Sequence, residues 1–272
     1  MTITDFSFKR FAQQPFYRQV NKQLVHLSGI QPGQHVVDLA CGTGTVTKLI
    51  LEKLRGAKDS LVIALDYSAE ALQQARAELG KVKMGMVKFM QGRAEQLSQM
   101  VKERVDAVFF CNAIHLIQEK SQLVAEVYQA LRPGGVFAFN TAFFQGAQLP
   151  ETEQFYRRWM SVAIRLLKRQ YNLLPQREKK VEARRQLTPE QYVELLQHQG
   201  FALKDQQICP IAVPLDGWLG ISQYEDFISG VLPGVPKDVG SQVLQQGVSQ
   251  VFKDLKLQSV PRNWLQLVAV RP

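Results

Sequence analysis

Short hydrophobic runs that end in glycine or in a polar residue predict strands along the first half of the chain. Between them, hydrophobic residues recur at helical spacing. Val36 and Val37 are expected in the first strand, and four further strands are expected at residues 61–65, 86–90, 106–111 and 136–140. The expected helices cover residues 7–29, 45–54, 68–79 and 120–131. Alternation of strand and helix is typical of βαβ units and therefore of an α/β fold.

The stretch from His35 to Gly44, H-V-V-D-L-A-C-G-T-G, carries the most information. It has a β-branched run, a carboxylate at Asp38 and two glycines, Gly42 and Gly44, ahead of a helix. Glycines permit a sharp turn whose backbone approaches a ligand closely. A phosphate loop is excluded because no Gly-Lys-Ser/Thr follows Gly44, and a dinucleotide fingerprint is excluded because Thr47 stands where its third glycine belongs.

Asp38 would repel a pyrophosphate but suits a cationic ligand. The pattern Asp-x-Ala-x-Gly-x-Gly resembles the first motif of class I S-adenosylmethionine-dependent methyltransferases, and Ala40 replaces the glycine that is common there. The resemblance implies that S-adenosylmethionine is the cofactor and that Asp38, Ala40, Gly42 and Gly44 bind it.

A second carboxylate, Asp66, ends the next strand 24 residues after Gly42. A carboxylate at this place can accept hydrogen bonds from both hydroxyls of a ribose. The resemblance further implies that Tyr67 packs on the adenine and that the leading helix, residues 7–29, covers the cofactor. Tyr17 on that helix either contacts the methionine carboxylate or only packs in the core.

After the third strand the chain departs from the resembled family. Arg93 stands where many members have an aspartate that accepts from the adenine amino group, and an arginine can only donate. Adenine recognition is therefore expected from the backbone near Ala94 or from Glu95.

The fourth strand leads into Asn112-Ala113-Ile114-His115 at the expected floor of the site. Methyltransferases that act on exocyclic amines of nucleic acid, or on protein glutamine, usually carry Asn/Asp-Pro-Pro-Tyr/Phe here, so this chain is not expected to act on those substrates. Asn112 is expected among the cofactor contacts. His115 either acts as a general base toward a substrate hydroxyl or lines the pocket.

Leu-Arg-Pro-Gly-Gly before the fifth strand continues the resemblance, which implies a Rossmann-like, seven-stranded, mostly parallel sheet with helices on both faces. The last helix and two strands are expected at residues 188–199, 201–214 and 264–270. The expected division is a cofactor-binding core at 1–141, a basic helical lid at 142–187, the rest of the core at 188–214 and 259–272, and a second helical insertion at 215–258.

Composition bears on the expected location of the protein and on whether it binds a metal. The chain has 272 residues, 46% of them hydrophobic, and no run long enough to span a membrane. The first residues do not have the pattern of a signal peptide, and three unpaired cysteines with four scattered histidines suggest no metal site and reduced thiols in a cytoplasmic protein.

Most of the net charge of +9 falls in the first insertion, where residues 151–186 hold ten Arg or Lys against four Glu. Arg157, Arg158, Arg165, Lys168 and Arg169 lie off the hydrophobic face of the expected helix. Such a charge run is often only a solvated face. The functional alternatives are a dock for an acidic carrier protein or anionic substrate, and a peripheral contact with an anionic membrane. Nucleic acid is not expected, because few aromatic residues are interspersed among these charges.

The sequence therefore predicts methyl transfer to a hydroxyl of a small, apolar or carrier-tethered intermediate. The end of the chain, with its lid, is similar to polyketide-type O-methyltransferases, which points to natural-product biosynthesis. Transfer to carbon, as in quinone methyltransferases, is the first alternative. A catalytically silent binding module is an alternative of another class.

Overall fold

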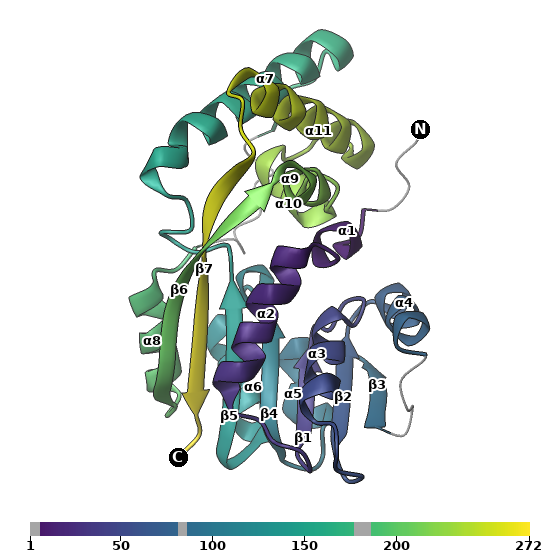
Figure 1. Ribbon diagram of the computed structural model, residues 1–272, viewed down its shortest axis with the longest axis vertical. Helices are drawn as coiled ribbons and strands as arrows, with labels where there is room; N and C mark the ends of the chain where they lie inside the picture. Colours follow the sequence, from purple (N-terminus) through teal and green to yellow (C-terminus); the bar gives the residue numbers. More distant parts are fainter. Residues whose placement is uncertain (1–5, 81–85, 177–185) are drawn as a thin grey trace. The chain divides into compact units, whose positions relative to one another are not determined.

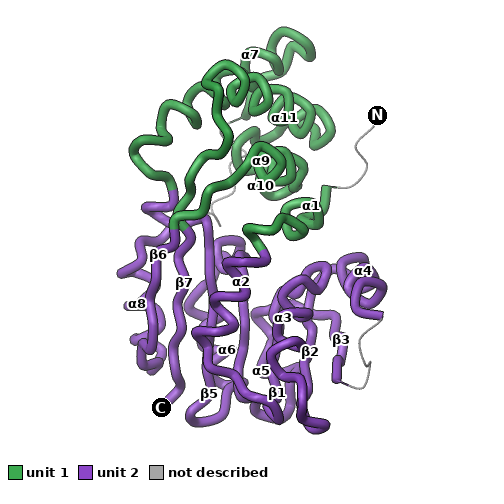
Figure 2. Tube along the Cα trace, viewed as in Figure 1, with its two compact units in different colours: residues 1–17, 148–184, 210–263 green, residues 18–147, 185–209, 264–272 purple. Residues whose placement is uncertain are grey.

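The computed structural model describes residues 6–80, 86–176 and 186–272. The chain divides into two compact units, which Figure 2 shows in different colours. Unit 1 comprises Met1–Tyr17, Gln148–Arg184 and Pro210–Asn263, and unit 2 comprises Arg18–Ala147, Arg185–Cys209 and Trp264–Pro272.

Unit 2 is built on a seven-stranded sheet with the order β3-β2-β1-β4-β5-β7-β6. The pairs β1–β2, β1–β4, β2–β3 and β4–β5 are parallel, and β7 pairs antiparallel with β5. The strands are β1 (His35–Leu39), β2 (Leu61–Asp66), β3 (Val87–Gln91), β4 (Val105–Cys111), β5 (Leu131–Thr141), β6 (Ala202–Pro214) and β7 (Ser259–Val270). The predicted mostly parallel, seven-stranded sheet is confirmed.

Two hydrophobic layers hold helices on opposite faces of this sheet (Figure 1). Leu24, Leu49 and Leu79 bring α2, α3 and α4 to one face, and Leu97, Leu123 and Leu196 bring α5, α6 and α8 to the other. These helices are α2 (Pro15–Ser28), α3 (Thr45–Lys53), α4 (Ala69–Leu79), α5 (Leu97–Met100), α6 (Lys120–Ala130) and α8 (Pro189–His198), with short 3-10 turns η2 (Ala94–Gln96) and η3 (Ile114–Leu116). Strands β1, β2 and β4 are buried at nearly every position, on both faces of the sheet. Their sequences are therefore mostly hydrophobic and do not alternate with polar residues.

The fifth strand begins earlier than the sequence pattern indicates. Leu131 already pairs with Val105, whereas Val136 pairs with Ala107, so four residues bulge out of the ladder between the two pairs. The predicted Arg-Pro-Gly-Gly turn is this bulge, and Gly134 adopts a positive φ of 77° within it.

The helices of unit 1 are α1 (Lys9–Ala12), η4 (Pro150–Thr152), α7 (Glu153–Tyr171), α9 (Leu215–Ile221), α10 (Glu225–Val231) and α11 (Lys237–Asp254). The two long helices, α7 and α11, pack closely, and Trp159 Nε1 donates to the carbonyl of Leu244 over 2.9 Å. A side chain at Gly247 would come within 3.3 Å of the backbone nitrogen of Ala163, so glycine is what lets the two backbones approach.

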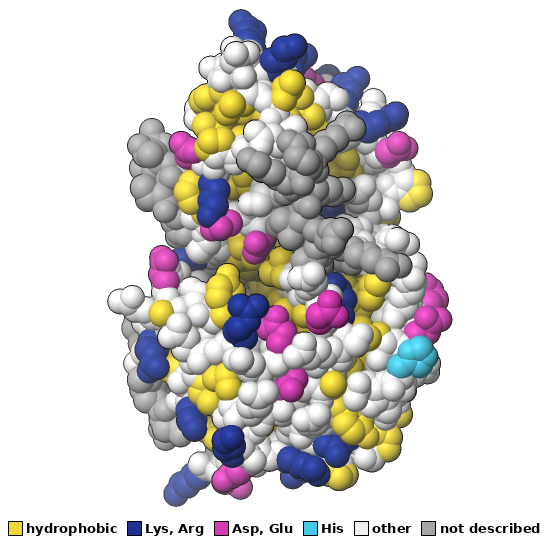
Figure 3. Space-filling view, turned by 180° about the vertical axis from the view of Figure 1, so that it is seen from behind, with side chains coloured by type: hydrophobic (Ala, Val, Ile, Leu, Met, Phe, Trp, Pro, Cys, Tyr) yellow, Lys and Arg dark blue, Asp and Glu magenta, His cyan; other side chains and the backbone are white. Residues whose placement is uncertain are grey.

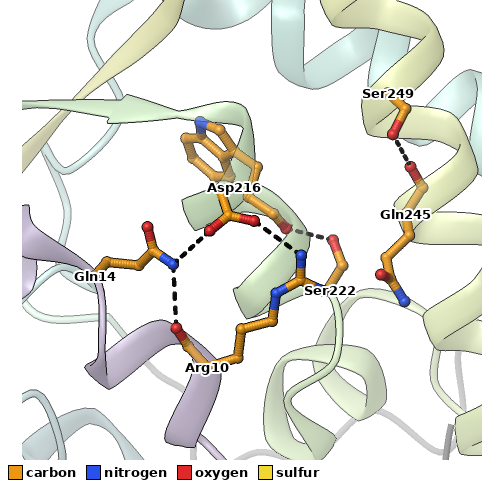
Figure 4. Close-up of polar contacts among 7 residues, drawn as sticks. Arg10, Gln14, Asp216, Ser222, Gln245 and Ser249 are labelled. Atoms are coloured by element: carbon orange, nitrogen blue, oxygen red, sulfur yellow. Dashed lines mark hydrogen bonds and ion pairs between the residues drawn. The ribbon is translucent and has the colours of Figure 1, made fainter.

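The predicted single helix over residues 7–29 is wrong, because the chain forms α1 and α2 with a break at Gln13 and Gln14. Pro15 begins the second helix, as proline does at a first helical position. The break turns α1 onto α9, where Asp216 accepts from Arg10 Nη2 at 2.8 Å and from Gln14 Nε2 at 2.9 Å (Figure 4). Phe11 packs with Phe8, Phe16 and Tyr17 around this contact.

Only part of the leading helical segment therefore belongs to the same compact unit as the sheet. The sequence placed residues 1–141 in one core, whereas the first 17 residues group with unit 1 and the unit boundary falls inside α2. The helices expected in the two insertions are present in unit 1, and their role as a lid stays a prediction. None of the helices in the described part of the chain is both long and apolar enough to cross a membrane.

The outward face of α7 carries the basic residues that the sequence singled out. Arg157, Arg158, Arg165, Lys168 and Arg169 are all exposed, whereas Phe155, Trp159, Val162, Ala163 and Leu167 are buried. Over unit 1, Lys and Arg side chains stand with hydrophobic ones between them (Figure 3). Five further basic residues of the insertion lie within 177–185, outside the described residues.

Candidate functional site

The sequence-predicted residues of unit 2 gather at the carboxyl ends of parallel strands. β1, β2 and β4 run side by side, with Asp38 paired to Ala64 on one flank and to Phe109 on the other. The strand order reverses between β1 and β4, and ligands of open α/β sheets bind outside the strand ends at such a point. The fold therefore places the glycine turn, Asp66 and Asn112 around the position where a ligand is expected.

A hydrogen bond links the glycine turn to the end of β2. Asp66 Oδ2 accepts from the Gly42 backbone nitrogen at 2.8 Å, and Asp66 Oδ1 accepts from the Ser68 nitrogen at 2.9 Å. Burial raises the pKa of Asp66, although these backbone donors oppose the rise. The carboxylate is thus held in place, with lone pairs remaining for further donors such as ribose hydroxyls.

The two glycines of the turn have different surroundings. Both have positive φ, 53° at Gly42 and 83° at Gly44, but a Cβ added to Gly42 would meet no atom within 4 Å. A Cβ at Gly44 would lie 3.1 Å from Leu79 Cδ1 and 3.3 Å from Ala75 Cβ. Gly42 therefore borders open space in the candidate site, whereas Gly44 allows α4 to pack against the turn. Ala40 also has a positive φ of 54°, which explains why glycine is the common residue there.

Asp38 is the most deeply buried carboxyl of the site, with 1% of its surface exposed. Thr47 Oγ1, on α3, donates to Asp38 Oδ2 over 2.5 Å. Burial raises the pKa of Asp38 from 3.8 to about 7, and the neighbouring Asp66 contributes in the same direction. A carboxylate in this position is destabilised without a cation, so it favours a positively charged ligand.

The expected adenine corner is partly assembled. Tyr67 is 70% exposed, and the Gln91 side chain donates to its backbone carbonyl at 3.2 Å, joining the ends of β2 and β3. Arg93 is exposed and lies 3.5 Å from Glu95, to which it donates. Ala94 begins η2, and Gly92 and Arg93 separate it from β3. A contact between adenine and Ala94 or Glu95 stays a prediction.

Asn112 has an unusual environment just beyond β4. Its φ is 51°, its Oδ1 accepts from the Ala142 nitrogen at 2.9 Å, and its side chain is nearly inaccessible to solvent. Its Nδ2 is buried without a hydrogen-bond partner among the described residues. Asn140, on β5, supports the turn by accepting from the Asn112 nitrogen and by donating to Asn21 Oδ1 at 2.8 Å.

His115 is held by the end of β5. Its Nδ1 lies 3.3 Å from Thr141 Oγ1, which also accepts from the Phe143 nitrogen at 3.0 Å. The imidazole stacks on Phe143 with ring centroids 4.2 Å apart, and only 7% of the residue is exposed. Asn140, Thr141 and Phe143 carry no motif in the sequence; only the pairing of β4 with β5 brings them here.

Tyr17 differs from the other predicted residues because it belongs to unit 1. There its ring packs against Phe8 and Phe11, so its contact with a methionine carboxylate stays a prediction. Among the described residues no group of three His, Cys, Asp or Glu side chains could hold a metal ion. Cys41 and Cys111 are buried near the site, and burial raises the pKa of each thiol.

Comparison with known proteins places this site in a family. Residues 30–200 match the methyltransferase domain family. The chain is 36% identical over 121 residues to an uncharacterized chloroplastic methyltransferase of Arabidopsis thaliana, a match that covers 42% of the chain and 32% of that relative. It is 33% identical over 144 residues to sterol 24-C-methyltransferase of Aspergillus fumigatus, covering 49% of the chain and 36% of the relative. It is 32% identical over 107 residues to a demethylmenaquinone methyltransferase of Leptospira interrogans, covering 38% of the chain and 41% of the relative.

The chain therefore spans well under half the length of these three curated relatives. Solved structures at low sequence identity resemble this chain in fold. The cyclopropane synthase MmaA2 of Mycobacterium tuberculosis matches with a TM-score of 0.59 at 13% identity, covering 93% of this chain and 84% of that one. A Haemonchus contortus N-methyltransferase solved with S-adenosylhomocysteine matches with a TM-score of 0.54 at 18% identity, covering 93% and 52%.

The family match covers more than half of the chain, and it includes the glycine turn, both carboxylates and the ends of β4 and β5. Sequence motifs, sheet order and site geometry agree with it. The chain belongs to the methyltransferase domain family.

Proposed function

We propose that this protein transfers the methyl group of S-adenosylmethionine to a ring carbon of a small, largely apolar, phenolic or lipid-like molecule. The observation that carries the cofactor assignment is the pair of buried carboxylates, Asp38 and Asp66, on either side of the Gly42 turn. When bound, S-adenosylmethionine supplies an electrophilic methyl group, and the protein must align the acceptor and exclude water.

The residues present fit this cofactor. Asp66 has acceptor capacity left for the ribose hydroxyls, and the open space beside Gly42 lets a ligand reach the backbone of the turn. The raised pKa of Asp38 is the expected signature of a carboxylate that a cationic ligand would stabilise. Tyr67 presents an exposed ring for the adenine face, and Tyr17, Ala94 and Glu95 remain proposed contacts.

The choice of carbon departs from the oxygen preference that the sequence suggested. Curated relatives include a sterol 24-C-methyltransferase and ubiquinone/menaquinone C-methyltransferases, which favours carbon. A hydroxyl oxygen is the second candidate acceptor, because the buried His115 could serve as a base toward it. We also propose that the substrate is a polyketide or other natural-product intermediate and that the protein acts in the cytoplasm.

We further propose that the helices of unit 1 form a lid that contacts the substrate and that the basic face of α7 docks an acidic carrier protein. Five exposed Arg and Lys side chains on one helix support a partner of opposite charge, since charge complementarity accelerates encounter. A peripheral contact with an anionic membrane is the alternative partner for the same face.

Product analysis tests the proposed function. Methyl-labelled S-adenosylmethionine would be incubated with the protein and a panel of naphthoquinols, phenols and carrier-tethered hydroxyacyl compounds, and the products identified by NMR. We expect a new carbon-bound methyl group with a quinol or phenol, and much less of it with Asp66→Ala when the cofactor concentration is limiting. A methyl group found on oxygen would favour the second candidate. Binding of the cofactor without transfer to any class would favour a silent binding module.

A further inference from the structure

Thr47 is a buried residue in the first turn of α3, shortly after the glycine turn. Its Oγ1 donates to Asp38 Oδ2 over 2.5 Å, and the two residues have 0% and 1% of their surface exposed. A threonine hydroxyl in a helix can also donate to a carbonyl one turn earlier, which would satisfy it locally. Among the described residues its acceptor is instead Asp38, near the end of β1. The dinucleotide fingerprint has a glycine at this position, which would lack the hydroxyl.

Both donors that oppose the effect of burial on Asp38 come from Thr47. Burial raises the pKa of Asp38, whereas the Thr47 hydroxyl and, to a smaller extent, the Thr47 backbone N–H lower it. That N–H is one of the first in α3, and such groups have no acceptor within their own helix. Asp38 forms no ion pair with any described residue. Since a hydrogen bond to a charged oxygen is stronger than one to a neutral oxygen, Thr47 favours the ionised carboxyl.

We propose that Thr47 is a positioning residue for cofactor binding, whose hydroxyl fixes the orientation of the Asp38 carboxyl and favours the ionised form that a cationic ligand requires. This inference rests on the proposed function, in which the cation is S-adenosylmethionine. In molecules whose Asp38 is protonated, binding of the cation releases that proton to solvent, and this release costs affinity. Thr47 keeps the protonated fraction small and so keeps the cofactor bound tightly near neutral pH.

Three other titratable groups of the strand ends interact with Asp38. Asp66, at the end of β2, raises its pKa further. Cys41 and Cys111, beyond β1 and at the end of β4, are thiols whose own pKa burial raises, so both stay neutral near pH 7. All three groups are the same in every variant of Thr47. A difference between two such variants therefore reports the hydroxyl and not its titratable neighbours.

The ionisation of Asp38 is tested first, in protein without ligand. The aspartate carboxyls would be labelled with ¹³C and titrated by NMR, and Asp38 assigned by the signal missing in Asp38→Asn. In the wild type we expect a pKa of about 7. Thr47→Val, which replaces the hydroxyl by a methyl group of similar size, should raise this pKa, and Thr47→Ser should leave it near the wild-type value. Equal values in the wild type and Thr47→Val would overturn the inference. If Thr47→Val does not fold, Thr47→Ala against Thr47→Ser provides the same comparison of a side chain with and without a hydroxyl.

Cofactor affinity is tested next, by calorimetric titration with S-adenosylmethionine at about pH 6, 7 and 8. Thr47→Val should bind about tenfold more weakly than the wild type at the lowest pH, the scale of one hydrogen bond to a charged group. The ratio of the two affinities should approach one as pH rises and Asp38 ionises in both proteins. Titration of the cofactor's own amino group cancels in this ratio. Thr47→Ser should follow the wild type.

The two measurements separate this inference from the proposed function. A loss of affinity in Thr47→Val that is the same at every pH would show a merely structural role and overturn the inference. Equal Asp38 titrations together with normal cofactor binding would also overturn it, while the proposed function stands. If neither protein binds S-adenosylmethionine at any pH, the proposed function fails and the role of Thr47 in cofactor binding falls with it. The Asp38 titration would in that case still show whether the hydroxyl controls the carboxyl.

Discussion

Asp66 Oδ2 lies 2.8 Å from the backbone nitrogen of Gly42, so the acid that ends β2 also holds the glycine turn that follows β1. One carboxyl thus fixes the shape of the turn and offers its remaining lone pairs to a ligand. Loss of this side chain should affect both the turn and the binding of the ribose.

Asp66→Ala should weaken S-adenosylmethionine binding by roughly 1.5–3 kcal/mol, the scale of hydrogen bonds to a charged group. Calorimetric titration measures the effect. Ser68→Ala is the matched control, because Ser68 caps α4 through the Ala71 nitrogen and its loss should lower stability alone, by about 1 kcal/mol. An unchanged dissociation constant in Asp66→Ala would remove this residue from the site.

The two glycines of the turn should respond differently to the same substitution. Gly42→Val faces open space, so beyond the strain of its positive φ it should mainly abolish cofactor binding. Gly44→Val meets Leu79 and Ala75 on α4 and should mainly lower the melting temperature. Binding and thermal unfolding would be measured on both variants. Normal affinity in a folded Gly42→Val protein would show that the open space is not the ligand's path.

Asp38 should make the stability of the ligand-free protein depend on pH. Its pKa is about 7 when folded and near 3.8 otherwise, so the folded state binds the extra proton between these values. Stability should therefore fall as pH rises from about 4 to about 7. Asp38→Asn removes this contribution and should raise stability more at pH 8 than at pH 5, measured by urea unfolding at both values.

The same variant should weaken binding of S-adenosylmethionine, and wild-type affinity should rise with pH through about 7 as Asp38 ionises. Asp66, whose pKa is also raised, contributes in the same direction and remains in the variant, so some pH dependence should persist. An Asn variant that is less stable than the wild type at pH 8 would contradict a destabilised carboxylate at this position.

Ala40→Gly should stabilise the protein by about 0.5–1 kcal/mol. A residue with a Cβ at a φ of 54° is strained by roughly 1–2 kcal/mol, which glycine relieves at a smaller cost in chain entropy. Ala64, on β2, does not have a positive φ. Ala64→Gly should therefore destabilise the protein, and it serves as the control. Chemical unfolding of both variants gives the comparison; a loss of stability in Ala40→Gly would refute the strain.

Charge reversal on α7 should affect partner encounter and not cofactor binding. Replacing Arg157, Arg158, Arg165 and Arg169 by Glu should slow turnover with an acidic carrier-bound substrate, and the effect should shrink as salt screens it. Reversal of Lys22, Arg55, Lys58 and Lys102, exposed on unit 2, changes the net charge equally and should have little effect. Equal rates in both variants would leave α7 a solvated face, and loss of binding to anionic vesicles alone would favour the membrane.

Strands and helices whose ends are marked by glycines or capping residues could be predicted from the sequence. Val36 and Val37 lead into glycines, and Thr188 with Gln191 forms the capping box that begins α8. The break before Pro15 was missed because the hydrophobic stripe continues across it. Thr141 could not be found as a partner of His115, since the two are 26 residues apart and meet only because β4 pairs with β5. The unit boundary inside α2 was missed because its cause, the packing of α1 on α9, is equally non-local.

The ion pair between Arg10 and Asp216 joins residues 206 positions apart in the chain. A ribosome that adds about 5–20 residues per second needs roughly 10–40 s to cover that separation. During this interval α1 has been synthesised but α9 has not. Phe11 and Phe16 therefore lack the α9 residues against which they pack in the folded protein. The parallel strands β1 to β5 are complete long before then. The leading segment thus keeps hydrophobic side chains without their native partners during this interval, the condition in which nascent chains are prone to aggregate.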